Sequence, residues 1–360
     1  MKRKTVALYD PYLDVLGGGE RHILSILEVL SHHDYDVTIF WDEDLTSEIH
    51  SRLQIAMPFT FTPNIFNKKT DPWKKQEILK AYDSFFYVTN GSYFFASARE
   101  NYIFCMIPQK NLYPTSFFNK VKTLNYRFIA NSQFTKYWLS QWGVKSEVIY
   151  PYISSDFSQY QPEKKQEKLI LSVGRFFPHL HSKRHDIVIS WFQDLQKKAQ
   201  FKNYHLVIAG NVKKEDERYF QKLALMAKND DHVTLMPNIS YSELLGLYKK
   251  ASYYWHLAGY EIDEKKHPEQ VEHLGITPLE AMASGCIVCG YQAGGLRELI
   301  TSHQNGFLFS TQEELFDIME SMQNGTSKKE KIRAQGITYV QEHFSYSVFE
   351  KQVLEVLHIV

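Results

Sequence analysis

Short apolar runs alternate with longer amphipathic stretches along most of the chain. The run Thr5–Tyr9 predicts a strand buried on both faces, and Glu20–Leu30, with apolar residues three and four positions apart, predicts a helix packed on a core. The same patterns predict strands at Val37–Trp41, Phe85–Thr89, Tyr102–Met106, Arg127–Ala130, Leu169–Val173, Leu206–Ala209, Val233–Met236, Tyr253–Leu257 and Ile287–Cys289. Helices are expected after the capping residue Ser132 and at Ile187–Lys197, Glu215–Lys228, Ser242–Lys250 and Lys328–Ile359. This alternation predicts an α/β fold with parallel, doubly wound sheets.

The periodicity is lost over Tyr150–Lys168, which is rich in Pro, Ser, Gln and Lys and indicates a connection between two halves. We therefore expect two Rossmann-like domains: an N-terminal domain over 1–150, a linker over 151–165, and a C-terminal domain over 166–340, followed by a helix within 341–360. The length of 360 residues suits this division, because a domain takes roughly 100–200 residues.

Charge and cysteine content narrow the class of protein. The 41 Lys and Arg balance the 41 Asp and Glu, which argues against a nucleic-acid-binding surface. The basic start reaches Asp10 and Pro11 too soon for a signal peptide, and no apolar run approaches the roughly 18 residues of a membrane span. Cys105, Cys286 and Cys289 are too few for a disulfide framework and are expected to be buried, reduced thiols. These features predict a cytoplasmic protein.

Ligands of open α/β sheets bind beyond the carboxyl ends of the strands, where loops lead into helices. The first such loop holds Gly17–Gly19, whose backbone can approach an anion closely, although a flexible turn explains the same residues. The corresponding loop of the second half holds Gly174 and Arg175, followed by Lys183. A guanidinium and an ammonium can neutralise a diphosphate there, and a solvated basic loop is the alternative.

The stretch EHLGITPLEAMASG, from Glu272 to Gly285, is the richest in candidate chemistry. Thr277 and Glu280 have the spacing of a capping box, Pro278 suits the first helical position, and Gly285 suits the helix end. Capping thus explains Glu280 but leaves Glu272 unexplained. Two carboxylates beside a helix start can bind sugar hydroxyls while the helix amides bind phosphate.

Three further features have structural explanations that are as good as the functional ones. Gly294–Gly295 precedes a short predicted helix and can line the same site or form a simple turn. His256 follows a predicted strand and can face a donor or be packed in the core. The histidines and acids of 261–273 lack a recognised ligand spacing, so no metal site is predicted.

The spacing of Glu272 and Glu280 resembles the E-x7-E motif of the large retaining GT-B glycosyltransferase family (family 4 type, glycosyl transferases group 1). The resemblance covers nearly the whole chain and is most specific in its later motifs, which occur in family order. The motifs are GGGER, NSQFT, VIYP, GRFF followed by SKRHD, WHLAGY, EHLGITPLEAMASG, GGLRELI and NGFLF. The run PEQVEHLGITPLEAMASG most resembles a bacterial branch similar to mannosyl- and glucosyl-transferring members.

The resemblance implies a GT-B fold, in which two Rossmann-like, doubly wound domains face each other across a cleft. The first domain would take the acceptor and the second a nucleotide sugar, and the helix within 341–360 would cross back to the first domain. It implies transfer of a hexose such as mannose or glucose, with retention, from a UDP- or GDP-linked donor to a glycan, lipid-linked or small-molecule acceptor. Neither a bound cofactor nor a metal is expected, and the oligomeric state stays open.

The resemblance also implies roles for individual residues. Arg175 and Lys183 would bind the diphosphate and stabilise the leaving charge, and Glu272 would contact the transferred sugar. Glu280 would hold the ribose hydroxyls. The other donor-binding residues that it implies are Gly18, Gly19, Gly174, His256, Gly275, Ile276 and Thr277.

Two departures from the family pattern leave alternatives open. The run Cys105–Pro108 has no histidine where many relatives carry one, and Lys183 lies eight positions after Arg175, farther than in many members. A catalytically silent nucleotide-sugar-binding subunit is therefore the alternative, and a sugar-nucleotide epimerase or hydrolase is less favoured.

Residues 101–146 contain no Asp or Glu but several Lys with interleaved aromatic residues. Such a face suits an anionic or lipid-linked acceptor, or peripheral contact with the inner face of an anionic membrane. An ordinary core with scattered, solvated lysines explains the same composition.

Overall fold

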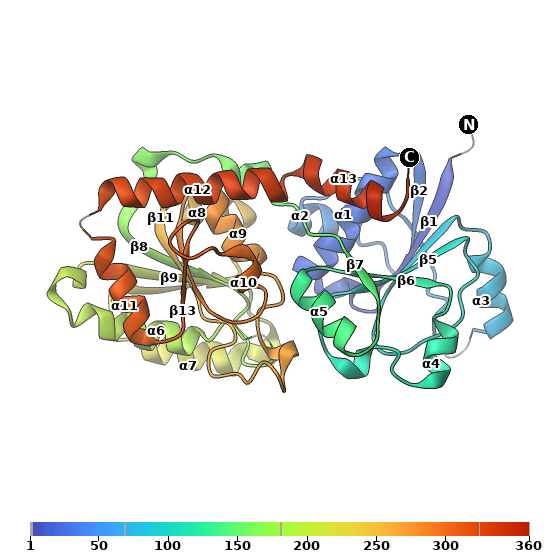
Figure 1. The fold of residues 1–360 in the computed structure, drawn as a ribbon, viewed down its shortest axis with the longest axis horizontal. Coiled ribbons are helices and arrows are strands. Elements are labelled where there is room, and N and C mark those ends of the chain that lie inside the picture. Colours follow the sequence, from blue (N-terminus) through green and yellow to red (C-terminus); the bar gives the residue numbers. More distant parts are fainter. Residues whose placement is uncertain (1–2, 68–69, 181, 324, 360) are drawn as a thin grey trace. The chain divides into compact units, whose positions relative to one another are not determined.

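The computed structural model describes residues 3–67, 70–180, 182–323 and 325–359 (Figure 1). The chain divides into two compact units: unit 1 is Met1–Pro151 together with Phe349–Val360, and unit 2 is Tyr152–Val348. Each unit holds a parallel sheet with helices packed on it, which confirms the predicted α/β class.

The sheet of unit 1 is parallel in all its described pairs, with the order β3-β2-β1-β4-β5-β6-β7. Its strands are β1 Lys4–Tyr9, β2 Tyr35–Phe40, β3 Thr60–Thr62, β4 Ser84–Val88, β5 Glu100–Cys105, β6 Tyr126–Ala130 and β7 Ser146–Val148. The helices of this part of the chain are α1 Gly18–His32, α2 Thr46–Leu53, α3 Pro72–Leu79, α4 Phe117–Lys122 and α5 Gln133–Gln141. Every residue of β4 is buried, because α3 and α5 pack on one face of the sheet and α1 on the other.

The sheet of unit 2 has the order β10-β9-β8-β11-β12-β13 and is likewise parallel in the described pairs. Its strands are β8 Gln166–Val173, β9 His205–Gly210, β10 Val233–Pro237, β11 Ala251–His256, β12 Ile287–Tyr291 and β13 Phe307–Phe309. Its helices are α6 His185–Gln196, α7 Glu217–Ala227, α8 Tyr241–Lys250, α9 Ile276–Ala283, α10 Leu296–Leu299, α11 Gln312–Ser321 and α12 Thr326–Phe344, and α13 Tyr346–Val356 leads into the last part of unit 1. Helices α6, α7 and α11 cover one face of this sheet, and α8, α9 and α12 cover the other (Figure 1).

In both sheets the strand order reverses beside the first strand of the unit, between β1 and β4 in unit 1 and between β8 and β11 in unit 2. Such a reversal opens a crevice at the carboxyl ends of the strands, because the connections on its two sides run to opposite faces. The predicted loop Gly17–Gly19 follows β1, and Gly174–Arg175 follows β8. Both therefore lie where a doubly wound sheet binds its ligand.

The strands and helices predicted from the apolar pattern are present, with ends shifted by a few residues, except in the tail. The prediction of continuous helix over Lys328–Ile359 is wrong. Ser345 is extended (φ −73°, ψ 158°) and separates α12 from α13, which ends at Val356. The pattern missed β3, β7 and β13, because three residues are too few to show a period.

Residues 152–165, which were expected to be a linker, belong to unit 2 and contain a buried aromatic residue. Phe157 is buried, and its ring contacts those of Tyr241 and Tyr248 on α8. This packing holds the segment against the unit that it precedes.

Candidate active site

The loop after β8 brings two cationic residues of the candidate site close together. Gly174 directly follows β8, and its N–H donates to the carbonyl of Ala209 on β9 (2.9 Å). Glycine is required here, because a Cβ atom on Gly174 would collide with the Cγ of Lys183. Lys183 thus lies beside the residue that precedes Arg175, despite the longer spacing in sequence.

The guanidinium of Arg175 lies over the ring of Phe177, with 4.4 Å between its central carbon and the ring centroid. Its Nε is buried and has no hydrogen-bond partner among the described residues. A buried donor without a partner is unfavourable, so this N–H is available for an acceptor that a ligand brings.

Lys183, Glu272 and His256 form one buried cluster. The Nζ of Lys183 and the Nε2 of His256 both bond to Oε2 of Glu272, the second over 2.7 Å. The side chains of Lys183, Glu272 and His256 are only 12%, 11% and 1% exposed. His256 ends β11, whereas Lys183 and Glu272 come from the loops before α6 and α9, so the sheet topology brings these groups together.

Burial disfavours the charged form of two histidines at this cluster. It lowers the pKa of His256, although the hydrogen bond to Glu272 offsets part of the shift, and it lowers the pKa of His185 to about 3. Because a carboxylate only accepts, the neutral ring of His256 carries its proton on Nε2. The charges of Lys183 and Glu272 compensate each other, and the ammonium keeps its other N–H groups for a ligand.

Helix α9 begins differently from the prediction. Its N-cap is Gly275, with φ 112°, a left-handed conformation that suits glycine, and a glycine has no side chain that could cap the helix. The predicted Thr277–Glu280 capping box is therefore wrong. The Oγ1 of Thr277 accepts a hydrogen bond from Tyr254 (2.8 Å), and Oε2 of Glu280 accepts one from Tyr248 (3.0 Å). Tyrosines from β11 and α8 hold the two side chains that capping was expected to hold.

The amino end of α9 presents backbone donors. Ile276 and Thr277 are its first two residues. The helix has no earlier turn whose carbonyls could accept hydrogen bonds from their N–H groups. Pro278, predicted to open the helix, is its third residue. The amides of Gly275, Ile276 and Thr277 give this end the partial positive charge that suits a phosphate. At the other end the prediction is confirmed, since Gly285 (φ 75°) follows the last turn.

The loop Gly294–Gly295 supports the backbone of Glu272. The N–H of Gly295 donates to the carbonyl of Glu272 (2.7 Å), and α10 starts at the next residue. The N–H of Gly294 donates to Glu264 (2.8 Å), which also pairs with Arg297. Of the two interpretations of this loop, these contacts favour a structural turn.

In unit 1 the glycine loop leads from β1 into α1. Gly17 is the N-cap, and its N–H donates to Oε2 of Glu20 (2.7 Å). Gly18 and Gly19 are the first helical residues, so their amides lie at the positive end of α1. Gly19 packs tightly against the thioether of Met106, directly after β5. The run that lacks a histidine thus lies beside the glycine loop.

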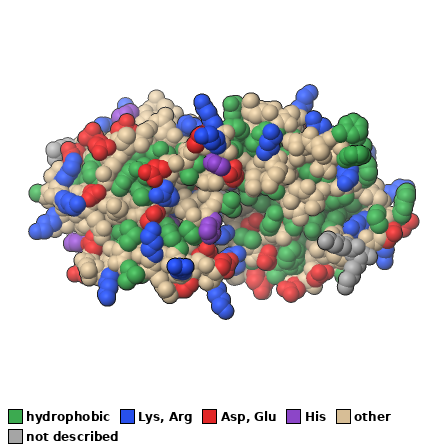
Figure 2. Space-filling model, turned by 90° about the horizontal axis from the view of Figure 1, so that it is seen from below, with side chains coloured by type: hydrophobic (Ala, Val, Ile, Leu, Met, Phe, Trp, Pro, Cys, Tyr) green, Lys and Arg blue, Asp and Glu red, His purple; other side chains and the backbone are tan. Residues whose placement is uncertain are grey.

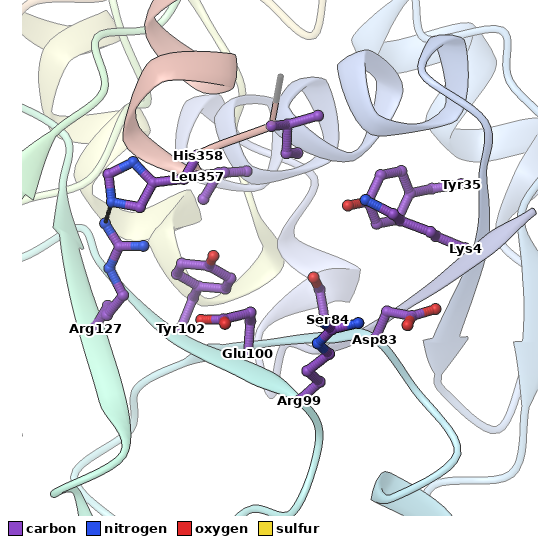
Figure 3. A pocket seen from close by; sticks show the side chains of 11 residues that line it. Lys4, Tyr35, Asp83, Ser84, Arg99, Glu100, Tyr102, Arg127, Leu357 and His358 are labelled. Carbon is purple, nitrogen blue, oxygen red and sulfur yellow. Dashed lines mark hydrogen bonds between the residues drawn. The ribbon is translucent and has the colours of Figure 1, made fainter.

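A cavity of about 220 Å³ lies at the other end of the unit 1 strands, away from the glycine loop (Figure 3). It is lined by residues at the amino ends of the strands, among them Lys4, Ser84 and Arg127, and by Leu357–Ile359. Arg127 donates to the carbonyl of Val356 at the end of α13 (2.9 Å). We interpret the cavity as the place where the C-terminal segment closes the amino edge of the sheet, since ligands of parallel sheets bind at the carboxyl edge.

Two tyrosines of the candidate site were not singled out from the sequence. Tyr254 lies two positions before His256 on β11, so both face the same side of the sheet, with ring centroids 6.1 Å apart. That periodicity could have identified Tyr254. The sequence carried no signal for Tyr248, because its partner Glu280 is 32 positions away on another element.

Surface and metal chemistry add little to this picture. The described residues contain no group of three or more His, Cys, Asp or Glu placed to hold a metal ion. His267 pairs with Glu269 (3.3 Å), whose carbonyl also contacts His273 (3.1 Å).

Over the ranges that the structure describes, no helix has both the length and the apolarity to cross a membrane. Lys and Arg side chains are interspersed with Asp and Glu on the face shown in Figure 2.

Residues 154–338, more than half of the chain, match the family model of the glycosyl transferases group 1. The chain belongs to this family. The matched range lies within unit 2 and contains Arg175, Lys183, Glu272 and Glu280. The membership of the glycosyl transferases group 1 that the motifs predicted is therefore confirmed.

Curated relatives of this group 1 chain include mannosyltransferases. Human alpha-1,3/1,6-mannosyltransferase ALG2 is 25% identical over 250 residues, which are 62% of this chain and 56% of that protein. The GDP-Man:Man(3)GlcNAc(2)-PP-Dol alpha-1,2-mannosyltransferase of Dictyostelium discoideum is 26% identical over 256 residues, 66% of this chain and 47% of that protein. The chain spans about half the length of these relatives.

Solved structures show the fold of this group 1 chain. Anabaena HepE in complex with UDP-glucose matches with a TM-score of 0.74 at 17% identity, over 99% of this chain and 100% of that chain. A glycosyltransferase from Rickettsia africae matches with a TM-score of 0.77 at 16% identity, over 100% of both chains. The fold is accordingly GT-B, with two Rossmann-like domains.

Proposed function

We propose that the protein is a retaining glycosyltransferase that moves a hexose from a nucleoside diphosphate sugar to a sugar, glycan or lipid-linked acceptor. The observation that carries this proposal is the buried cluster of Lys183, Glu272 and His256 near the amino end of α9 in a chain of this family. Departure of the nucleoside diphosphate develops negative charge, and preorganised cations and amides stabilise that charge in the transition state.

The proposed roles follow from the contacts in unit 2. Arg175 and Lys183 bind the diphosphate, because both offer N–H donors at the carboxyl end of β8. Glu272 contacts the hydroxyls of the transferred sugar, and Lys183 and His256 hold its carboxylate in one orientation. Glu280 holds the ribose hydroxyls, oriented by Tyr248.

Backbone groups complete the proposed donor site. The amides of Gly275, Ile276 and Thr277 support the phosphates, and Gly174 leaves room for Lys183. In unit 1, the amides of Gly18 and Gly19 are proposed to bind an anionic group of a substrate. Residues 1–150 are proposed as the acceptor domain and 166–340 as the donor domain.

The names of the relatives narrow the donor. GDP-Man stands in the name of the Dictyostelium enzyme, and HepE was solved with UDP-glucose. We propose a GDP- or UDP-linked mannose or glucose. Two cationic side chains at the diphosphate support a reaction that needs no metal, and transfer at an unchanged rate in excess EDTA is the expected result.

We also propose the cytoplasm, at the inner face of the membrane, as the place of the reaction. Cys105, Cys286 and Cys289 are all free and buried, which suits a reducing compartment. The basic composition of residues 101–146 suits an anionic acceptor there.

A thermal-shift panel of UDP, GDP, ADP and their hexose conjugates tests the proposal. A ligand that binds only the folded state at about 100 times its Kd adds about 2.7 kcal/mol of stability, so one nucleotide should stand out. Arg175→Ala should reduce the thermal shift caused by the nucleoside diphosphate and leave unchanged the shift caused by the corresponding nucleoside, which is measured alongside. NMR of the anomeric proton after transfer then reads retention or inversion. Binding without transfer to any acceptor would favour the silent subunit, and free epimerised or hydrolysed sugar the other alternative.

A further inference from the structure

Helix α4 of unit 1 and the turn after it hold apolar side chains out in solvent. Phe117 is 75% exposed, Phe118 77%, Leu124 81% and Val121 37%. Phe117 and Val121 are four positions apart on α4, so they lie on one face of the helix, and Leu124 follows in the turn after it. Large apolar side chains that cluster in solvent mark a contact surface for a partner.

The rings of Phe117 and Phe118 contact each other, with centroids 6.0 Å apart. They therefore form one exposed aromatic cluster at the amino end of α4. At the other end of the segment Thr123 is buried, and its hydroxyl donates to the carbonyl of Asn119 within the same segment (2.9 Å). The side of the segment that carries Thr123 therefore faces unit 1, while the four apolar side chains remain exposed.

The charges carried by this segment have one sign. Lys120 and Lys122 lie on the same helix, and residues 101–146 contain no Asp or Glu. An aromatic and aliphatic face flanked by lysines matches the boundary of an anionic bilayer, where rings enter the acyl region and ammonium groups remain among the phosphates.

We propose that residues 117–124 dock unit 1 onto a bilayer that contains anionic lipid. The contact is peripheral, because the apolar part comprises two aromatic and two aliphatic side chains on a six-residue helix and its turn. Such docking would hold an enzyme of the proposed function beside lipid-linked acceptors. The docking rests on the proposed location at the inner face of the membrane, but it requires neither donor nor acceptor, so a failure to bind vesicles and a failure to transfer sugar are separate results.

Co-sedimentation of the full chain with phosphatidylcholine vesicles, with and without phosphatidylglycerol, tests the docking. We compare Phe117→Ser/Phe118→Ser and Lys120→Gln/Lys122→Gln with the wild type. Leu225→Ser is the matched control, since Leu225 is 71% exposed on α7 of unit 2. Circular dichroism and the Tm verify that each variant folds, as expected for exposed positions.

The wild type should bind the anionic vesicles, and added salt should weaken the binding. The phenylalanine pair should weaken it by at least about tenfold. The lysine pair should weaken it by about 25-fold, at about fivefold for each lysine, while Leu225→Ser binds as the wild type does.

Three results would overturn the proposal. The wild type could fail to bind the anionic vesicles, or the phenylalanine variant could bind as well as the wild type. Sedimentation velocity without lipid could instead show a dimer that the phenylalanine variant loses, which would make a second copy of the chain the occupant of this face.

Discussion

Replacing Glu272 by leucine removes the carboxylate that Lys183 and His256 share. Because the side chains of Lys183 and Glu272 are 12% and 11% exposed, the ammonium would stay buried without its counter-ion. Breaking such a pair costs about 3–5 kcal/mol. In a unit of about 200 residues, 1 kcal/mol lowers the Tm by about 2–4 °C, so the expected loss is about 6–20 °C.

The double variant Lys183→Met/Glu272→Leu removes both charges and keeps the side-chain volumes similar. It should unfold within about 1–2 kcal/mol of the wild type, because paired buried charges contribute little net stability over an apolar pair. The single variant Lys183→Met, which leaves Glu272 without its counter-ion, should cost at least about 1 kcal/mol, so the coupling free energy from the double-mutant cycle should be at least about 2 kcal/mol. Sugar transfer should stay lost in the double variant, since the proposed roles need the two charges.

Urea unfolding monitored by the hydrogen exchange of peptides from 152–348 measures the stability of unit 2 separately from that of unit 1. Donor turnover is measured on the same samples. If Glu272→Leu is as stable as the wild type, the ion pair carries no weight in the fold. If the double variant transfers sugar at the wild-type rate, the pair is structural and the proposed catalytic roles are wrong.

Three further variants test other parts of the site. Glu280→Gln should keep the Tm within about 1 °C, because Glu280 is not part of a capping box and an amide oxygen still accepts a hydrogen bond from Tyr248. Calorimetric titration should nevertheless show nucleotide binding weakened about tenfold. Unchanged binding would refute the ribose role. Gly174→Ala should lower kcat and destabilise by about 1–3 kcal/mol, because its Cβ collides with Lys183; the control Gly246→Ala, whose Cβ meets no described atom within 4 Å, should stabilise α8 by up to about 1 kcal/mol. Burial lowers the pKa of His185 to about 3, so the unfolded state takes up a proton below about pH 6.5 while the folded state does not, and stability falls with pH. His185→Phe should therefore flatten the urea stability curve between pH 7 and pH 5 by about 2 kcal/mol, and parallel curves would contradict a depressed pKa.

Local patterns carried most of the fold. A strand buried on both faces needs apolar residues in succession, so β4 and β11 could be read from the chain directly. Ser132 was expected to cap the helix after it, and its Oγ accepts from the N–H of Thr135 (3.0 Å). Gly285 likewise ends α9 as expected, because the left-handed turn after a helix depends on the residue at that position.

The capping box at α9 shows where local reasoning stops. Thr277 and Glu280 have the right spacing, but a hydroxyl and a carboxylate bond to whichever donor lies nearest in space. Tyr248, 32 positions before Glu280, donates to that carboxylate, and Tyr254, 23 positions before Thr277, donates to that hydroxyl. Sequence spacing predicts local hydrogen bonds only where the tertiary structure supplies no competitor.

Residue types and their order along the chain were enough for the fold class, the family motif and the candidate residues of the site. The pairing of Lys183 with Glu272 across 89 positions, and of His256 with the same oxygen, depends on the order of β8, β11 and β12 in the sheet. The neutral state of His256 has the same origin, because the environment that excludes water is built from elements far apart in sequence. Composition supplied the lysines and aromatic residues of 101–146, but only folding left Phe117, Phe118 and Leu124 in solvent while it buried Tyr113 and Tyr126.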